Sequence, residues 1–165
     1  GTTNLLIRLL TERLGGPQAA VDFLYQQIFE PLGMRRSVLE PDASGLFVGS
    51  SYIYASTRDW ARLGLLMLEG GVLNGARLLS QAWIDRATTP NVSHNDQRYG
   101  YQFWLNSGSS DLRWQDLPAD AYAMNGNRAQ IVMVVPSRQA VIVRLGWTAG
   151  QYPLNENLAQ VLTLL

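Results

Sequence analysis

Lysine and cysteine are absent from the sequence and histidine occurs once, and each shortage excludes a kind of chemistry. The basic residues are 13 arginines, which stay protonated and cannot serve as general bases or form Schiff bases. Without cysteine there is no disulfide, thiolate metal ligand or cysteine nucleophile, and the redox compartment stays open. The histidine, His94, lies in the polar stretch 93–96, which predicts a solvated surface loop.

The charges of the chain cancel. Its 13 basic and 13 acidic residues give a formal net charge of zero. No basic stripe with interleaved aromatics is present, so we expect no nucleic-acid partner. No apolar run reaches the roughly 18 residues that a membrane-spanning helix needs, so we expect no membrane span. The length of 165 residues and the apolar content of 47% are ordinary for one globular domain.

Hydrophobic spacing predicts a mainly helical first part, residues 1–98. Gly-Gly pairs, prolines and Ser or Thr caps divide this part into segments. We expect the second helix to end at Ile28, because proline, here Pro31, disfavours a helical residue before it. The expected helices are residues 5–14, Gln18–Ile28, a helix capped near Ser56 that ends at Gly70, and a short helix capped by Ser80. Residues 40–54 predict an ordered loop, and Asn74-Gly75 predicts a tight turn.

Residues 99–165 have a different pattern, which predicts antiparallel strands and a closing helix. Strands are expected in Tyr99–Leu105, Gln130–Val135 and Ala140–Leu145, with a short connection through Pro136, and the closing helix in Asn155–Leu164. The fold class is therefore α/β of the α+β type, an antiparallel sheet flanked by helices. We expect no internal domain boundary.

Common hydrolase and nucleotide-binding motifs each lack a required residue. There is no Gly-x-Ser-x-Gly nucleophile elbow, and a Ser-His-Asp triad would depend on His94. A His/Cys metal site cannot be assembled, and a Walker-type phosphate loop needs lysine. A pair of carboxylates for glycoside hydrolysis stays open, because the spacing of such a pair is spatial. We expect no cofactor and no bound metal.

Several segments resemble one family when they are taken in order. Residues 29–34, 54–64 and 71–75, together with the strand start at 99–104, are similar to signatures of the class C β-lactamase-like serine hydrolases. Each motif is short, but their order and spacing cover nearly the whole chain. The chain most resembles a subgroup near the 6-aminohexanoate-oligomer hydrolases and related esterases.

This resemblance implies the β-lactamase/transpeptidase-like fold and its mechanism. In that family a serine of a Ser-x-x-Lys pair attacks the carbonyl group, and the lysine and a tyrosine move the proton. The chain holds neither the pair nor the tyrosine motif. We therefore expect residues 1–165 to be a single C-terminal fragment, with 1–98 mainly from the helical domain and 99–165 from the sheet and the C-terminal helix. The family also favours the bacterial periplasm over the cytoplasm.

The resemblance further implies where the third family motif falls. That motif is normally Lys-Thr-Gly or His-Thr-Gly on a strand facing the serine, and the run 130–136 places it at Met124-Asn125-Gly126. Asn127, the residue after the motif glycine, would supply a backbone N–H to the oxyanion hole. Gly126 and Asn127 are thus the candidate catalytic residues. Met124 departs from the basic residue, which argues against recognition of a β-lactam or peptide carboxylate.

Residues around this motif are candidates for substrate binding: Met124, Asn125, Arg128 and Trp104. Trp104 would line the cleft or, like Trp60 and Trp83, belong to the core. Arg128 would bind an acidic substrate group or remain a solvated turn residue. On the plainer interpretation, residues 124–126 are only a strand end and a turn.

Two functions remain open. The first is part of an enzyme that hydrolyses an ester or amide bond of a small molecule through an acyl-serine intermediate, with the isolated chain inactive. The second is a non-catalytic binding or assembly module derived from that family. A truncated sheet would leave an edge and a helix face uncovered, so we also expect self-association.

Overall fold

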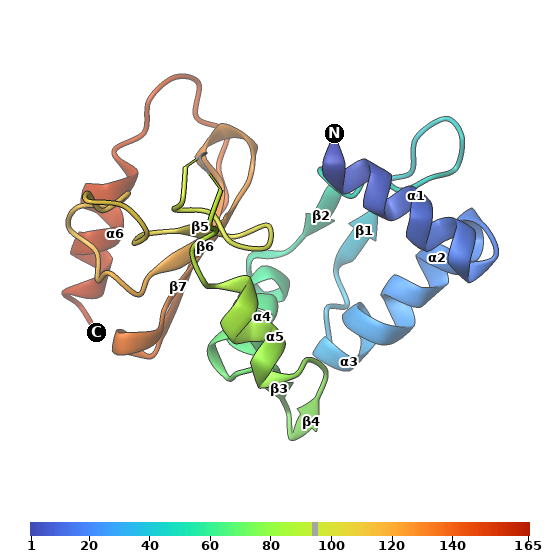
Figure 1. The fold of residues 1–165 in the computed structure, drawn as a ribbon, viewed down its shortest axis with the longest axis horizontal. Coiled ribbons are helices and arrows are strands. Elements are labelled where there is room, and N and C mark those ends of the chain that lie inside the picture. Colours follow the sequence, from blue (N-terminus) through green and yellow to red (C-terminus); the bar gives the residue numbers. More distant parts are fainter. Residues whose placement is uncertain (94–95) are drawn as a thin grey trace. The chain divides into compact units, whose positions relative to one another are not determined.

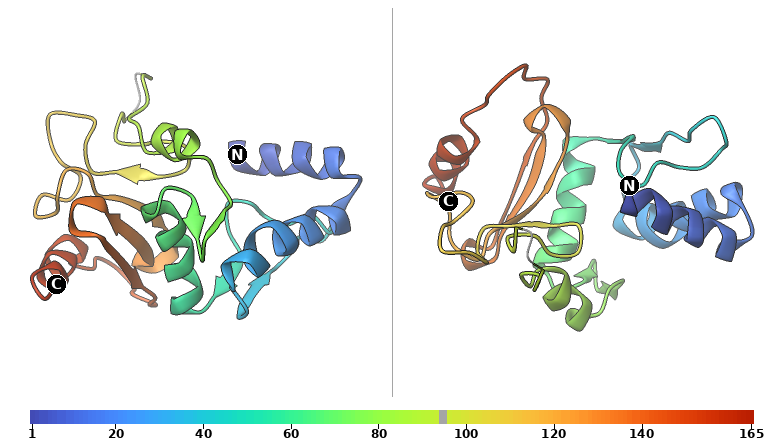
Figure 2. Two further views of the ribbon diagram at one scale, coloured as in Figure 1. Left: turned by 90° about the horizontal axis from the view of Figure 1, so that it is seen from below. Right: turned by 45° about the horizontal axis from the view of Figure 1, so that its top comes forward.

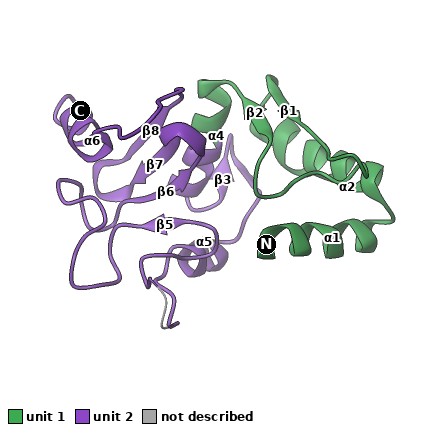
Figure 3. Ribbon diagram, turned by 90° about the horizontal axis from the view of Figure 1, so that it is seen from above, with its two compact units in different colours: residues 1–62 green, residues 63–165 purple. Residues whose placement is uncertain are grey.

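The computed structural model describes residues 1–93 and 96–165; His94, expected in a surface loop, lies outside them. The chain divides into two compact units, Gly1–Arg62 and Leu63–Leu165 (Figure 3). This division falls inside the helix α4 (Thr57–Leu68), where no Gly-, Pro- or Ser-rich linker marks it in the sequence. Within the described residues, none of the helices has the length and apolar content that crossing a membrane requires.

The first unit begins with helices that follow one another closely (Figure 1). α1 (Thr2–Leu14) ends at Gly15, whose φ of 96° is the left-handed conformation that glycine adopts most readily. α2 (Pro17–Leu24) runs on into a π-helix (Tyr25–Phe29) and then α3 (Glu30–Leu32). The two helices expected here from hydrophobic spacing are both present.

The expected end of the second helix at Ile28 is wrong. The helical backbone continues past Pro31, because the π-helix changes the hydrogen-bonding pattern just before α3 and the proline stands in the first turn of α3. Proline has no N–H to donate, and here it lies where the π-helical bonding gives way to α-helical bonding. Gly33, with φ of 68°, then ends the helix.

The rest of the first unit contains a short antiparallel pair, β1 (Ser37–Leu39) with β2 (Ile53–Ala55). Residues 40–54 form the expected irregular connection, apart from Ile53 and Tyr54, which belong to β2. Buried Ala20, Leu39 and Phe47 pack together as the core of this unit.

A buried carboxylate ties this core to the start of α4. Asp59 is 3% exposed and accepts hydrogen bonds from the backbone N–H of Arg36 at 2.7 Å and from the Ser37 hydroxyl at 3.2 Å. The guanidinium of Arg62 donates to its second oxygen at 2.9 Å. The Ser56 hydroxyl accepts the N–H of Asp59 at 3.2 Å, which confirms the expected helix cap.

The second unit is built on a four-stranded antiparallel sheet in the order β5-β6-β7-β8. The strands are β5 (Trp104–Leu105), β6 (Tyr122–Asn125), β7 (Ile131–Val135) and β8 (Ala140–Arg144). A hairpin of β3 (Val72–Leu73) and β4 (Ala76–Arg77) and the helix α5 (Gln81–Ala87) precede the sheet, and α6 (Leu154–Leu162) follows it. The last two expected strands, the closing helix and the Ser80 cap of α5 are confirmed, the cap by a hydrogen bond of 3.2 Å from the N–H of Trp83.

Alternation along the strands gives the sheet two buried faces. On one face Ala123 and Met133 pack against Leu158 of α6, which lies beside the sheet in Figure 2. On the other face Tyr122 and Val134 pack against Ile84 of α5. Side chains of β6 and β7 therefore belong to two separate apolar clusters, one on each face of the sheet.

Two expectations about aromatic residues are wrong. Tyr99–Leu105 is not one strand, because a turn at Gln102, with φ of 66°, folds the chain back so that Tyr99 bridges Trp104 and only β5 joins the sheet. Trp83, expected in the core, is 40% exposed, because α5 buries Ile84 and Ala87 instead. Trp60 is half-buried.

Candidate functional site

The loop between β6 and β7 holds the candidate catalytic residues. Gly126 leaves β6 in an extended conformation, and its N–H donates to the oxygen of Gln130 at 2.8 Å. The N–H of Gln130 donates to the oxygen of Asn127 at 3.3 Å and closes a tight turn whose two central residues are Arg128 and Ala129. A β-carbon on Gly126 would lie 3.2 Å from Cβ of Gln130, so glycine fits this narrow hairpin end best. The motif residues Met124 and Asn125 thus end a strand, as expected.

The turn has an unusual backbone. Arg128 and Ala129 have φ of 61° and 59°, so two successive residues other than glycine are left-handed. Each such residue costs roughly 1–2 kcal/mol relative to right-handed backbone. A conformation of this kind persists only where neighbouring groups hold it, and such residues cluster at functional sites.

The N–H of Asn127 is available at this turn. Asn125, Gly126, Asn127 and Arg128 are exposed. Among the hydrogen bonds formed within residues 1–93 and 96–165, none uses the N–H of Asn127, whereas the N–H of Gly126 is engaged. A free backbone N–H at an exposed strand end is the type of donor that stabilises an oxyanion.

The sheet separates two of the candidate substrate-binding residues. Met124 is half-buried and packs on the face that carries Tyr122 and Val134. Trp104 pairs with Ala123 and packs on the opposite face. The structure therefore brings Asn125 and Arg128 to one hairpin end and leaves Trp104 elsewhere.

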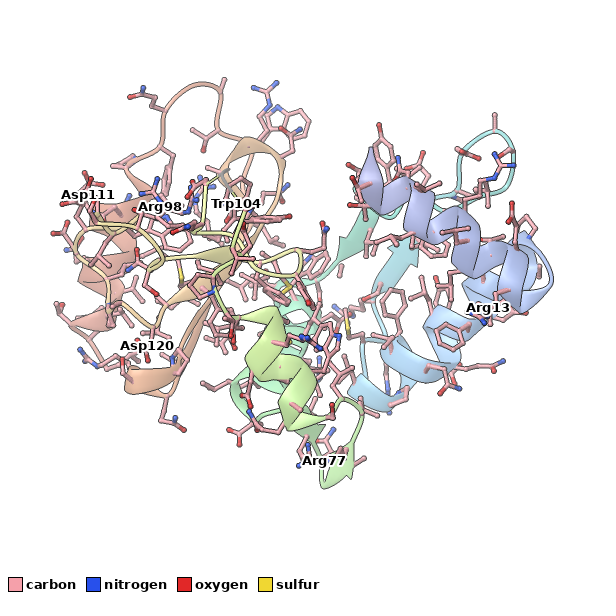
Figure 4. The ribbon with its side chains drawn as sticks, viewed as in Figure 1. Arg13, Arg77, Arg98, Trp104, Asp111 and Asp120 are labelled. Atoms are coloured by element: carbon pink, nitrogen blue, oxygen red, sulfur yellow. The ribbon has the colours of Figure 1, made fainter. Side chains whose placement is uncertain are left out.

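Trp104 belongs to its own polar and aromatic cluster. The Tyr99 ring meets it edge-on at 4.9 Å, and the Arg113 guanidinium lies 4.6 Å from its ring centre. Arg113 also bonds Asp96 at 2.6 Å and the main-chain oxygen of Arg98 at 3.1 Å. Figure 4 shows Arg98 and Trp104 on the same side of this unit. These contacts fix Trp104 as a half-buried packing residue.

Arginines dominate the surroundings of the turn. The guanidinium of Arg128 lies 5.1 Å from the ring centre of Trp147, a tryptophan that is 78% exposed. Arg144 at the end of β8 donates to main-chain oxygens of the turn. Neither Arg128 nor Arg144 has a carboxylate partner among the residues that the structure describes. Sequence patterns do not reveal Arg144 or Trp147, because their contacts to the turn are long-range in the chain.

General bases and metal ligands are not supplied by this region. Burial raises the pKa of Tyr122, and this buried phenol therefore stays protonated at neutral pH. In the part of the chain that the structure describes, no cluster of His, Cys, Asp or Glu side chains is suited to hold a metal ion. Among the described residues, the turn therefore presents main-chain N–H groups and the arginine side chain of Arg128.

A cavity lies at the opposite end of β7. It has a volume of about 500 Å³ and is lined by residues of the loop at 115–118 and of α6, together with Arg138. Because β7 separates Arg138 from Asn127, this cavity is not part of the turn. A bound substrate at the turn would have to be held by other surfaces.

Comparisons with known proteins agree on one family. A family model described as Beta-lactamase matches residues 1–162. The 6-aminohexanoate-dimer hydrolase of Paenarthrobacter ureafaciens is 26% identical over 113 residues, which are 67% of this chain and 29% of that protein. The crystal structure of a beta-lactamase from Mycobacterium bovis superposes with a TM-score of 0.69 at 18% identity, over 98% of this chain and 59% of that one.

The match over residues 1–162 shows that this chain belongs to the beta-lactamase family of hydrolases. The structural similarity confirms the expected fold class, helices with antiparallel sheets in the β-lactamase fold. The chain spans less than a third of the length of the curated relative and less than two thirds of the solved structure.

Proposed function

We propose that this chain is part of a serine hydrolase that cleaves an ester or amide bond and that Asn127 supplies an oxyanion donor. The observation that carries the proposal is the exposed, unbonded N–H of Asn127 at the end of β6. The membership of the chain in a hydrolase family supports it. A donor preorganised at the site of developing charge is worth roughly 2.7–4 kcal/mol in other hydrolases.

The proposed step is the attack of a serine oxygen on the substrate carbonyl carbon. The new C–O bond forms as the carbonyl π electrons move to oxygen, and the resulting oxyanion accepts the N–H of Asn127. When the oxyanion collapses, the bond to the alcohol or amine breaks and the leaving group takes the serine proton by way of the base. Water then hydrolyses the acyl-serine. On this proposal the serine of a Ser-x-x-Lys pair, its lysine and the tyrosine come from outside residues 1–165.

The side chains near the turn favour a substrate whose group beside β6 is uncharged. Met124 packs among apolar side chains and brings no charge where the family motif has a basic residue. We therefore propose a small-molecule ester or amide as the substrate rather than a penicillin. Arg128 stands on the exposed side of the turn and would meet the part of the substrate that points to solvent.

The test is covalent trapping of the complete protein that contains this chain. After treatment with a fluorophosphonate probe, intact-mass and peptide analysis should show one adduct, on the serine of a Ser-x-x-Lys sequence upstream of Gly1. A chromogenic ester should be hydrolysed faster than a chromogenic cephalosporin. No adduct, together with no ester hydrolysis, would contradict the proposal.

The second candidate is a non-catalytic assembly module, which the surface of α1 favours. Leu5, Leu6 and Leu9 are each more than 50% exposed on this helix. Exposed apolar side chains of this density tend to mark association surfaces. On this candidate, sedimentation of the chain would show a dimer or a larger species. A variant with serine in place of Leu5, Leu6 and Leu9 would sediment as a monomer. A monomer with the original leucines would argue against this candidate.

A further inference from the structure

Arg144 joins the end of β8 to the candidate oxyanion turn. Its position is opposite Ile131, the first residue of β7 after the turn. Nη1 of Arg144 donates to the main-chain oxygen of Ala129 at 2.7 Å and to that of Arg128 at 3.4 Å. Its hydrogen bonds therefore reach both left-handed residues of the turn.

The guanidinium of Arg144 is itself held from several sides. Nη2 donates to the Thr148 hydroxyl at 2.6 Å, and the guanidinium carbon lies 3.6 Å from the ring centre of Tyr152. A β-carbon on Gly146 would come within 2.8 Å of Nη2, so the glycine leaves room for the guanidinium. An ammonium group could also donate to the two carbonyl groups, but it has no second nitrogen to bond Thr148 at the same time and no planar face to set against the Tyr152 ring.

The contacts of Arg144 compensate a strained backbone. The left-handed conformation of Arg128 and Ala129 is unfavourable for side chains with a β-carbon. Charge-assisted hydrogen bonds to the two carbonyl oxygens stabilise this conformation relative to others. The Asn127 N–H belongs to the peptide between Gly126 and Asn127, and hydrogen bonds flank this peptide on both sides: the N–H of Gly126 bonds the oxygen of Gln130, and the N–H of Gln130 bonds the oxygen of Asn127. Holding residues 128 and 129 in place keeps both bonds and so restrains the direction of the Asn127 N–H.

We propose that Arg144 is a positioning residue that aims the N–H of Asn127 at the oxyanion. The assignment rests on the proposed function, because the N–H matters for catalysis only if a carbonyl group reacts there. Arg144 does not contact the substrate in this arrangement. It acts through the carbonyl groups of Arg128 and Ala129.

Arg138 provides a matched control for the test. Its guanidinium also donates to a main-chain oxygen, that of Leu162, at 2.9 Å, but at the other end of the β7–β8 hairpin. Loss of either arginine removes a partly buried hydrogen bond to a main-chain oxygen. Only Arg144→Ala should change the turn at 126–130.

The experiment compares kcat and KM of the complete protein with those of its Arg144→Ala, Arg144→Lys and Arg138→Ala variants on one chromogenic ester. We expect Arg144→Ala to lower kcat by about tenfold to a hundredfold, with KM nearly unchanged, because misplacement of an oriented group acts on the transition state. Arg144→Lys should recover little of the loss, and Arg138→Ala should keep the original kcat even if it melts at a lower temperature. An unchanged kcat in Arg144→Ala, or a rise in KM alone, would overturn the assignment.

A second measurement decides the point if the protein shows no esterase activity, which would contradict the proposed function itself. In ¹H–¹⁵N spectra of the same variants, Arg144→Ala should shift or broaden the amide signals of Gly126 to Gln130, and Arg138→Ala should leave them in place. Unmoved signals in Arg144→Ala would show that the arginine does not position the turn.

Discussion

Gly64 of α4 lies against Val141 of β8 so closely that a β-carbon on the glycine would come within 2.5 Å of Val141 Cγ1. The same β-carbon would lie 3.0 Å from Val132 Cγ1 on β7. A residue without a side chain therefore lets this end of α4 pack directly on the sheet of the second unit. Glycine is usually unfavourable inside a helix, so packing and not helix propensity explains its presence here.

Replacing Gly64 by alanine should destabilise the protein. Alanine gains about 1 kcal/mol in helix propensity, but overpacking of a filled interior typically costs about 1–3 kcal/mol. We expect a net loss of roughly 1 kcal/mol, and a larger one for Gly64→Val, measured by urea denaturation. Arg58→Ala, at an exposed position of the same helix, is the control and should change stability by less than about 0.5 kcal/mol. A stabilised Gly64→Ala variant would contradict the close packing.

The substitution Ala129→Gly should stabilise the turn. Glycine removes the cost of roughly 1–2 kcal/mol that a β-carbon adds at a φ of 59°, while losing about 0.5–1 kcal/mol of unfolded-state entropy. The expected result is a gain of up to about 1 kcal/mol in the free energy of unfolding. Ala140→Gly, at a buried position of β8 without positive φ, should instead destabilise. Equal losses in the two variants would refute the strain at Ala129.

The charge of Asp96 should persist in acid. Hydrogen bonds from the side chain and backbone of Arg98, and then from Arg113, lower the pKa of this carboxyl well below its ordinary value of 3.8. Because the folded pKa is the lower one, the stabilising contribution is present above the unfolded pKa of 3.8, declines as the pH falls below that value, and is gone once the pH has fallen through the folded pKa.

Carboxyl ¹³C titration would check this shift. We expect Asp96 to stay charged at pH 3.8 and its pKa to rise towards that value in Arg98→Ala. Arg77→Ala is the control, since Arg77 donates to main-chain oxygens of Gly70 and Leu79 and should leave Asp96 unaffected. An ordinary pKa for Asp96 in the original chain would contradict these contacts.

Residues 1–165 by themselves should be inert. The chain has no lysine, and an isolated serine hydroxyl without a base is a poor nucleophile. Exposed serines such as Ser50 and Ser51 should therefore give no adduct with a fluorophosphonate or, separately, with a penicillin, by intact-mass analysis. One stoichiometric adduct on either serine would move the catalytic centre to that loop.

Local signals in the sequence were sufficient for much of the fold. Ser80 is a helix cap, and Asn74-Gly75 makes the β3–β4 turn with φ of 51° and 78°, because such signals depend on neighbours in the chain. The helix through Pro31 was missed because a π-helix before a proline overrides the usual stop signal. Exposure of Trp83 was missed because the orientation of α5 is set by tertiary packing.

Only the part of the candidate site that lies at the end of β6 could be predicted from the sequence. The sequence places Met124, Gly126 and Asn127 at a strand end, and the structure agrees. Trp104 could not be assigned to a face, because the register of β5 with β6 is not encoded locally. Arg144 reaches Ala129 from another strand, a contact that no local pattern contains.

The most direct test of the proposed function is to delete the N–H of Asn127 while keeping the backbone. Proline is suited to this position because Gly126, with ψ of 174°, has the extended conformation that proline favours before it, and because no hydrogen bond within residues 1–93 and 96–165 uses the Asn127 N–H. In the complete protein, Asn127→Pro should lower kcat on an ester by about a hundredfold to a thousandfold. Asn127→Ala keeps the N–H and should stay within a few-fold of the original, and both variants should melt cooperatively. Equal kcat values for the proline and alanine variants would contradict an oxyanion donor at Asn127.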